Sequence, residues 1–198
     1  MPSYVDYTKT QLNKFRSTDN VLVICPGFTG LDQSNRSNRN SSYYIDQPGI
    51  VTISGEDGDL IDSLDKVRKV KQFNRVIMNR VFEHLPIRNI DYYICQLYSV
   101  MAPNGIIEMI TPDSNAIAME LQHAWKTKPI DLFRIHRLNH ELFSEGNDVK
   151  DRHCLWCDEH SVKYLMEAEG LFKFVSSRKI RLDTNIIPPE IQFEFKRI

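Results

Sequence analysis

Several features that would place a protein in a specialised class are missing from this sequence. No run of about 18 apolar residues occurs, so we expect no membrane-spanning helix. The N-terminal segment lacks the apolar core of a secretory signal. Four cysteines in 198 residues do not suggest a disulfide framework. Together these absences predict a reduced, cytoplasmic protein.

An excess of charge of either sign is also missing. The 25 Lys and Arg residues nearly balance the 26 Asp and Glu residues, so the total charge of -1 does not indicate a nucleic-acid partner. Hydrophobic residues make up 41% of the chain, which is ordinary for a globular protein. The length suits a single domain over residues 1–198. The sequence does not indicate the oligomeric state.

Short apolar segments alternate with helix-forming segments along the first half of the chain. After a leading helix within residues 1–20, the pattern predicts strands at 21–25, 42–46, 49–59, 74–81 and 105–113. Helices are expected at 59–73 and 89–101, from the helical spacing of their apolar residues. Uniformly apolar strands that alternate with helices indicate a parallel sheet covered on both faces.

The second half of the chain has a different pattern. Residues 114–143 predict two helices broken near Pro129, within a helical insertion or lid over 114–157. A further helix is expected at 158–169, ended by Gly170. The alternating segments 171–183 and 190–198 should pair antiparallel at the sheet edge. The predicted fold is therefore α/β and Rossmann-like: a doubly wound, mainly parallel sheet with an antiparallel C-terminal hairpin.

Candidate binding residues follow from this fold, because open parallel sheets bind ligands beyond the carboxyl ends of their strands. In nucleotide-binding folds, an acidic residue about 20 positions after a glycine turn can accept hydrogen bonds from the hydroxyls of a ribose. Asp46 lies 19 positions after Gly27. The pattern favours an adenosine-type ligand. The residues at the ends of the first four strands are Cys25, Gly27, Asp46, Asp57, Asp59 and Asn79.

Residues 76–113 carry a more specific signal. Glu83, His84, Leu85 and Pro86 follow the fourth strand, and a Pro-Asn-Gly turn at 103–105 precedes the fifth. With a late segment at 152–172, these motifs resemble the class I S-adenosylmethionine-dependent methyltransferases, in particular a small subgroup that carries the "EHLP" motif. The resemblance covers most of the chain from residue 21 onward.

This resemblance implies a seven-stranded sheet, S-adenosylmethionine as the cofactor and an acceptor that the sequence does not identify. It implies that the loop at Cys25 and Gly27 faces the methionine part, and that Asp46 takes the ribose hydroxyls. The remaining cofactor contacts that it implies are Asp57 and Asp59 beside the adenine, with Asn79 and Arg80 on the far side.

The first strand departs from the family pattern. Val23 stands where an acidic residue is usual, and Cys25 replaces the first glycine. An alternative is therefore a non-catalytic binding or scaffolding module that has kept the fold and lost the cofactor. A nicotinamide-dependent oxidoreductase ranks third, because the loop lacks the third glycine of that fingerprint at the right offset.

The histidines offer candidate catalytic bases. His84 or His153 would assist transfer to a hydroxyl or amine, although His84 could equally pack beneath the next helix. Glu83 could bond backbone amides at that helix start. We predict no metal centre, because neither available pattern supplies a complete ligand set. Those two patterns are His153, Cys154, Cys157 and His160 in one segment, and His136 with His140 in another.

Aromatic and basic residues elsewhere remain open to two interpretations. Trp125 and Phe133 could belong to a lid over a substrate pocket or to the core between two helices. Arg36 and Arg39 lie in a loop rich in Ser and Asn, where they could reach a phosphate or a nucleic-acid backbone, although arginines in such loops are usually just solvated.

Overall fold

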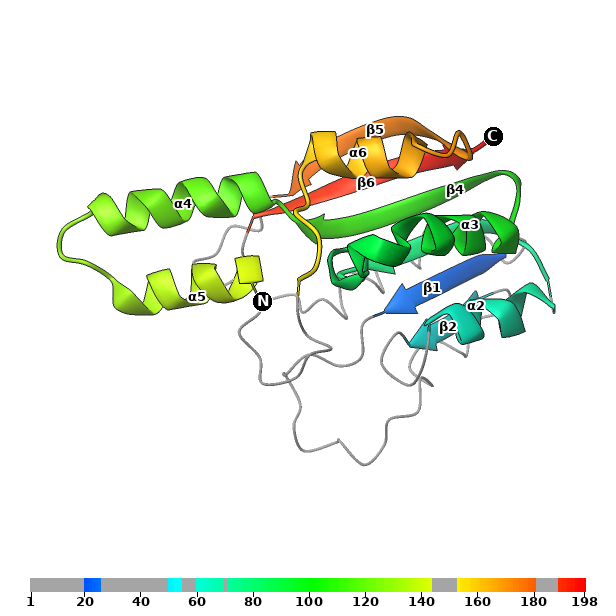
Figure 1. Ribbon diagram of the computed structural model, residues 1–198, viewed down its shortest axis with the longest axis horizontal. Helices are drawn as coiled ribbons and strands as arrows, with labels where there is room; N and C mark the ends of the chain where they lie inside the picture. The colour runs from blue at the N-terminus through cyan, green and yellow to red at the C-terminus, as the bar shows by residue number, and fades with distance from the viewer. Residues whose placement is uncertain (1–19, 26–49, 55–59, 70, 144–152, 181–188) are drawn as a thin grey trace, which may run out of the picture.

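The computed structural model describes residues 20–25, 50–54, 60–69, 71–143, 153–180 and 189–198 (Figure 1). No helix in these segments is long and apolar enough to cross a membrane. The strands are β1 (Val21–Cys25), β2 (Ile50–Ser54), β3 (Phe73–Asn79), β4 (Met101–Pro112), β5 (Phe172–Ile180) and β6 (Glu190–Arg197). The α-helices are α2 (Leu60–Arg68), α3 (Ile90–Val100), α4 (Ser114–Lys126), α5 (Leu132–Phe143) and α6 (Glu159–Glu167), with short 3-10 turns η3 (Phe82–His84) and η4 (Ile87–Asn89).

The described strands form one mixed sheet in the order β2-β1-β3-β4-β6-β5. β1 is parallel to β2 and β3, and β3 is parallel to β4. β6 lies between β4 and β5 and is antiparallel to both. The predictions of an α/β class, of parallel leading strands and of an antiparallel C-terminal pair are confirmed.

Side-chain burial explains why these segments form strands. The four residues 21–24 of β1 are fully buried, as expected for a strand in the interior of a parallel sheet. β6 instead alternates, with Ile191, Phe193 and Phe195 buried. The one charge within the apolar part of β4, Glu108, forms an ion pair with Arg75 on the neighbouring strand.

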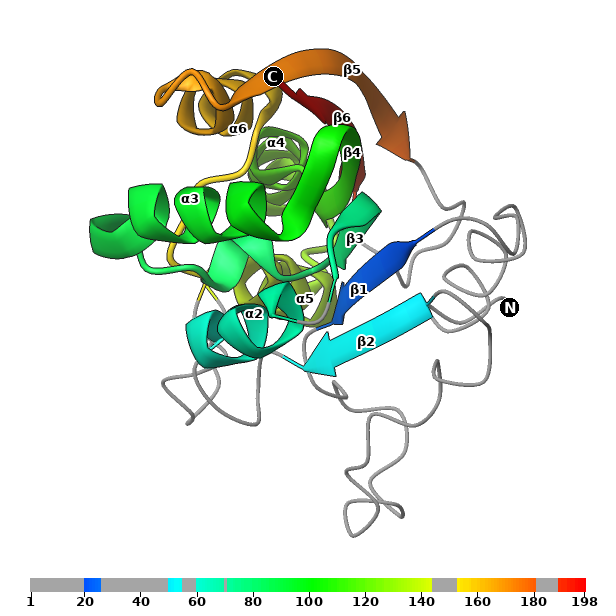
Figure 2. The same ribbon diagram turned by 90° about the vertical axis from the view of Figure 1, so that its right-hand side faces the viewer.

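The helices α2, α3 and α6 lie along one face of the sheet (Figure 2). Their buried side chains, among them Leu64, Ile94 and Val162, join the strands in a continuous apolar core. Coverage of the second face, which a doubly wound fold requires, stays a prediction. So does a seventh strand, because the expected strand at 42–46 and the leading helix within 1–20 lie outside the described residues.

Helices α4 and α5 form a hairpin that projects beyond the end of β4 (Figure 1). Two helices broken near Pro129 were predicted here, and both are present. The hairpin has a small core of its own, formed by Ile117, Ala124, Ile135 and Leu138. It is therefore held together by contacts separate from those of the sheet.

Helix α6 begins next to Asp158 as the sequence predicts, but it ends at Glu167, two residues before the predicted end at 169. The Asp158 carboxylate caps it by accepting hydrogen bonds from the Ser161 N–H and hydroxyl, at 2.7 and 2.8 Å. Burial acts against ionisation of Asp158, but these bonds, together with one from Asn115, lower its pKa. After the helix, Gly170 has a φ of 65°, a conformation that glycine adopts without strain.

The predicted turn at 103–105 is part of β4, where it forms an irregularity. Met101 pairs with Phe73, but the next pair joins Ile106 to Arg75, so extra residues loop out of the strand. Asn104 has a φ of 60°, and asparagine is one of the few residues that tolerate this left-handed conformation. A Cβ on Gly105 would lie 2.9 Å from the Ala102 carbonyl oxygen, so the backbone approach requires glycine.

This approach makes Gly105 the more sensitive of the two turn residues. Gly105→Ala should lower the free energy of unfolding by about 1–3 kcal/mol, because the new methyl group overpacks against backbone. Asn104→Gly is the control in the same turn and should change stability by less than about 0.5 kcal/mol. Urea denaturation measures both, and equal stability of the two variants would contradict the steric explanation.

Candidate functional site

The sheet register aligns the carboxyl ends of the parallel strands at one edge. Cys25 pairs with Ser54, and Asn79 pairs with Ile110. Because β6 is antiparallel, it begins at this edge, where Glu190 pairs with Pro112. The ends of β1, β2, β3 and β4 and the start of β6 therefore surround one region, as the sequence predicted for the parallel strands.

Arg80 organises this edge. Arg80 directly follows β3 and has a φ of 56°, a backbone conformation that residues other than glycine rarely adopt. Its backbone N–H donates a hydrogen bond to the Ile110 carbonyl oxygen at 2.9 Å. Its guanidinium donates to Glu190 at 2.7 Å and to Glu141 of α5 at 3.1 Å. Glu190 is 2% exposed, so this is a buried ion pair. Neither Glu141 nor Glu190 was a candidate from the sequence.

Glu83 lies next to this network with its carboxylate buried. It is 1% exposed, and neither of its carboxylate oxygens has a hydrogen-bond partner within the described residues. The possibility that Glu83 bonds the backbone amides of other residues at this turn is not realised among the described residues. Its carbonyl oxygen instead accepts from the N–H groups of Cys154 and Leu155, at 2.7 and 3.1 Å. Burial raises the pKa of Glu83 to about 7, although the nearby Arg80 charge acts in the opposite direction.

These backbone bonds bring together the two predicted catalytic histidines. The rings of His84 and His153 meet edge to face, with centroids 4.8 Å apart. Burial, helped by the positive charges of His84 and Arg80, lowers the pKa of His153 to about 4. His153 is therefore neutral at pH 7, and its imidazole can accept a proton or bind an electrophile.

The structure brings together only some of the predicted binding residues. Asn79 is 7% exposed at the end of β3, beside Arg80. Cys25 ends β1, but its side chain is not described. Gly27, Asp46, Asp57 and Asp59 lie outside the described residues, so their roles stay predictions.

The cysteines and other histidines of the two sequence patterns that we considered for a metal belong to no group of three potential ligands among the described residues. Cys157 is buried, and burial raises the pKa of its thiol, whereas Cys154 is exposed. Within the described segments, one group of three potential metal ligands occurs: Glu83, His84 and His153, whose ligand atoms lie within 4.8 Å of one another. This group was missed because Glu83 and His153 are 70 residues apart in the sequence.

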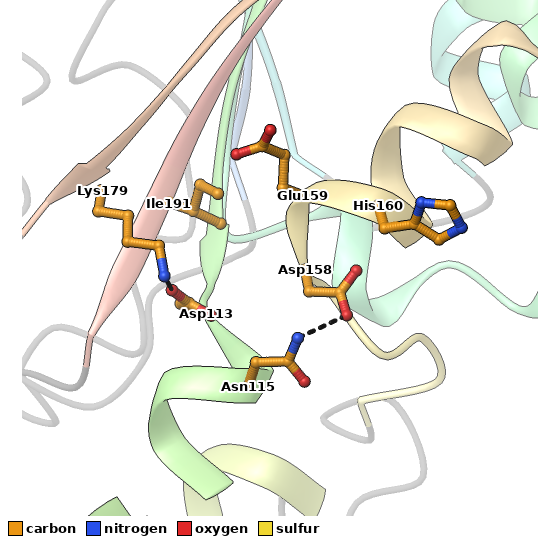
Figure 3. Close-up of a pocket in the computed structure, with 7 residues that line it drawn as sticks. All are labelled: Asp113, Asn115, Asp158, Glu159, His160, Lys179 and Ile191. Atoms are coloured by element: carbon orange, nitrogen blue, oxygen red, sulfur yellow. Dashed lines mark hydrogen bonds and ion pairs between the residues drawn. The ribbon is translucent and has the colours of Figure 1, made fainter. Parts of the chain in front are cut away.

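A small pocket lies on another side of the β4 end (Figure 3). Its volume of about 240 Å³ is below the 300–1,000 Å³ usual for small-molecule sites. Lys179 pairs with Asp113 at 3.2 Å and Asn115 donates to Asp158 at 2.8 Å across it, so its polar groups are engaged. The lining residues are Asp113, Asn115, Asp158, Glu159, His160, Lys179 and Ile191.

The aromatic residues of the α4–α5 hairpin do not form its core. Trp125 is 52% exposed and Phe133 is 78% exposed, whereas the packed residues between the helices are aliphatic. The core interpretation of these aromatics is therefore wrong. Their role in a lid stays a prediction.

Comparison with known proteins identifies the architecture. No protein-family profile and no curated protein sequence matches the chain. Solved structures do match over nearly its whole length. One is an S-adenosylmethionine-dependent methyltransferase from Anabaena variabilis ATCC 29413. The match spans 98% of this chain and 83% of that protein's chain, at 12% identity and a TM-score of 0.58. The chain has a methyltransferase-like fold.

Two further methyltransferases support this conclusion. One from Methanosarcina mazei covers 96% of the chain with 97% of its own, at 11% identity and a TM-score of 0.52. The 1,6-didemethyltoxoflavin-N1-methyltransferase of Burkholderia thailandensis, solved with S-adenosylhomocysteine, covers 99% with 79% of its own, at 10% identity and a TM-score of 0.53. Identities this low establish the methyltransferase-like fold and leave the activity to be tested.

The buried ion pairs of Arg80 lead to a stability prediction. Arg80→Met should lower the free energy of unfolding by about 3–5 kcal/mol, because Glu190 would remain buried without its partner. The double variant Arg80→Met/Glu190→Gln should recover part of this loss.

Arg134→Met is the matched control, because its 3.6 Å pair with Glu120 is more exposed and should contribute less than about 1 kcal/mol. Chemical denaturation of all three variants at pH 7 is the measurement. Equal losses for Arg80→Met and Arg134→Met would contradict the buried-pair interpretation.

The raised pKa of Glu83 leads to a pH prediction for chelator-treated protein. Its pKa is about 7 in the folded chain and about 4.5 when unfolded, so folding favours the protonated acid. Between pH 4.5 and pH 7 the carboxyl group is ionised in the unfolded chain but still protonated in the folded chain. The free energy of unfolding therefore falls as the pH rises through this range. Glu83→Gln should match the wild type near pH 5 and exceed its stability at pH 8, by up to about 3 kcal/mol.

Glu169→Gln, at an exposed position after α6, is the control and should keep the pH dependence of the wild type. Thermal and urea unfolding across this pH range provide the comparison. A Glu83→Gln variant whose stability follows the wild type at every pH would exclude a buried, destabilising carboxylate.

Proposed function

We propose that this protein transfers a methyl group from S-adenosylmethionine to an acceptor that remains to be identified. The observation that carries the proposal is the methyltransferase-like sheet with a buried polar cluster at the carboxyl edge of β3 and β4, where such folds bind ligands. The cofactor supplies an activated methyl group on a sulfonium. The protein's contribution is to position the reactants and exclude water.

The register of β2 refines the proposed cofactor contacts. Ser54, the last residue of β2, pairs with Cys25 at the end of β1, and in the sequence Asp57 and Asp59 follow soon after Ser54. In our proposal Asp57, three residues after Ser54, takes the ribose hydroxyls that the resemblance gave to Asp46. Asp59 would then lie toward the adenine, and Asn79 would line the opposite side with Arg80.

The proposed catalytic roles rest with the histidines. Deprotonation of a hydroxyl or amine acceptor requires a base within reach of the acceptor's proton, and His84 and His153 are the candidates. His153 is a weak base at neutral pH, because burial lowers its pKa to about 4. We therefore assign the proton transfer to His84 and an orienting role to His153.

The main alternative is a binding module without a cofactor. It is favoured by Val23, which is fully buried in β1 at the position where the family has an acidic residue. A cleft that accepts no cofactor would show no response to S-adenosylmethionine. The same titration therefore distinguishes the two functions.

Calorimetric titration with S-adenosylmethionine and S-adenosylhomocysteine is the first experiment. We expect binding in the micromolar range, weakened about 10- to 100-fold in Asp57→Ala, because a charged hydrogen-bond acceptor is worth about 1.5–3 kcal/mol. Asp46→Ala tests the assignment from the resemblance. Asp65→Ala is the matched control, because this partly exposed residue on α2 forms an ion pair with Arg68 of the same helix.

Two outcomes would change the proposal. Weaker binding in Asp46→Ala, with Asp57→Ala unaffected, would return the ribose contact to Asp46 and keep the methyltransferase. No heat and no thermal shift at millimolar cofactor would reject the enzyme and favour the binding module.

A further inference from the structure

We propose that Glu83, His84 and His153 form a binding site for one divalent transition-metal ion of the Zn²⁺ type. Each residue contributes one potential ligand atom, and these atoms lie within 4.8 Å of one another. Tetrahedral Zn²⁺ ligands lie about 3.4 Å apart, given metal–ligand bonds of about 2.1 Å. The three donors therefore surround a space of the right scale and would draw closer around an ion.

The donor set selects the kind of metal. Two imidazoles with one carboxylate form a common set for zinc and for other first-row metals that prefer nitrogen ligands. Magnesium and calcium prefer oxygen ligands throughout, so they suit this site poorly. Three protein ligands leave a position open for water or for an oxygen of a bound molecule.

The unpartnered carboxylate of Glu83 is the second observation that points to a ligand. Both oxygens are buried and make no hydrogen bond to another described residue, although buried carboxylates are normally paired or bound to metal. The carboxylate belongs to the same three-residue group as both imidazoles. A cation in that group would supply the missing interaction.

The surrounding charges favour a divalent cation. In the ion pairs of this network Arg80 is the positive partner, and its guanidinium is shared by Glu141 and Glu190. Adding the Glu83 carboxylate gives three negative charges against one positive charge, when all are ionised. A divalent ion would therefore balance the cluster, and the carboxylates offset its repulsion by Arg80.

Backbone contacts hold the ligands in place before any ion arrives. Glu83 and His84 belong to the turn η3, and the Glu83 carbonyl accepts from the N–H groups of Cys154 and Leu155. These bonds fix the backbone directly after His153 against the turn. The site therefore joins two distant segments through main-chain bonds, which limits the reorganisation needed for binding.

The test is titration of the full chain, stripped with a chelator, with Zn²⁺ alone and then with Mg²⁺ alone. We expect one Zn²⁺ per chain, with much weaker binding of Mg²⁺. Glu83→Gln preserves the shape of the side chain, and His153→Ala removes one imidazole. Each should weaken Zn²⁺ binding by more than about 100-fold, since loss of a merely supporting residue already costs 10–100-fold.

Cys154→Ser and His160→Ala are the matched controls, because both residues are exposed neighbours in the same segment and lie outside the three-residue group. Both should bind Zn²⁺ as the wild type does. Thermal unfolding without metal establishes that each variant is folded, and Zn²⁺ should raise the melting temperature only where binding persists. Co²⁺ substitution should give a spectrum without a thiolate charge-transfer band.

Several results would overturn the proposal: no Zn²⁺ binding by the wild type, binding retained in folded Glu83→Gln and His153→Ala, or a Co²⁺–thiolate band. The titration contains no S-adenosylmethionine, so its result is independent of the proposed methyl transfer. If the metal binds, His84 acts as a ligand and not as the base, and the metal would instead lower the pKa of an acceptor oxygen bound at the open position, whose proton would pass to solvent.

Discussion

The buried pairing of Arg80 with Glu190 joins the two halves of the sheet at the edge where the candidate site lies. Arg80 follows a parallel strand, whereas Glu190 begins the antiparallel strand β6, 110 residues later. The two meet because β6 inserts beside β4 with its first residue at the carboxyl edge. A third partner, Glu141, connects the same guanidinium to the α4–α5 hairpin. The sheet, its C-terminal strand and the projecting hairpin thus share one partly buried cation.

This shared cation explains the unusual electrostatics of the cluster. Arg80 is already engaged by two carboxylates, so it cannot also compensate fully for the burial of Glu83. The carboxyl group of Glu83 therefore stays without a partner, and its pKa rises to about 7. Buried side chains with shifted pKa values and without hydrogen-bond partners are found more often at functional sites than in cores that serve stability alone.

The two proposals for this edge use the same side chains in different ways. Methyl transfer needs a positioned acceptor and a base, and the paired histidines offer one. Metal binding needs neutral imidazoles and a carboxylate, and a metal-bound oxygen would become a better nucleophile. A methyltransferase-like fold can hold either chemistry, because the fold sets the place of the site and the side chains set its reaction.

Local sequence patterns determined the elements of this protein, and long-range packing determined its site. The apolar run at 21–25, the alternation at 190–197 and the turn residues Asn104 and Gly170 predict strands and turns from nearby residues alone. The boundary at 101 was missed, because β4 continues through a turn that pairing with β3 holds in the sheet. The contacts of Glu83, Glu141 and Glu190 depend on strand order and register. Charged residues carry no periodic signal that reports which distant partner they will meet, so only the tertiary structure decided that these carboxylates surround Arg80 and two histidines.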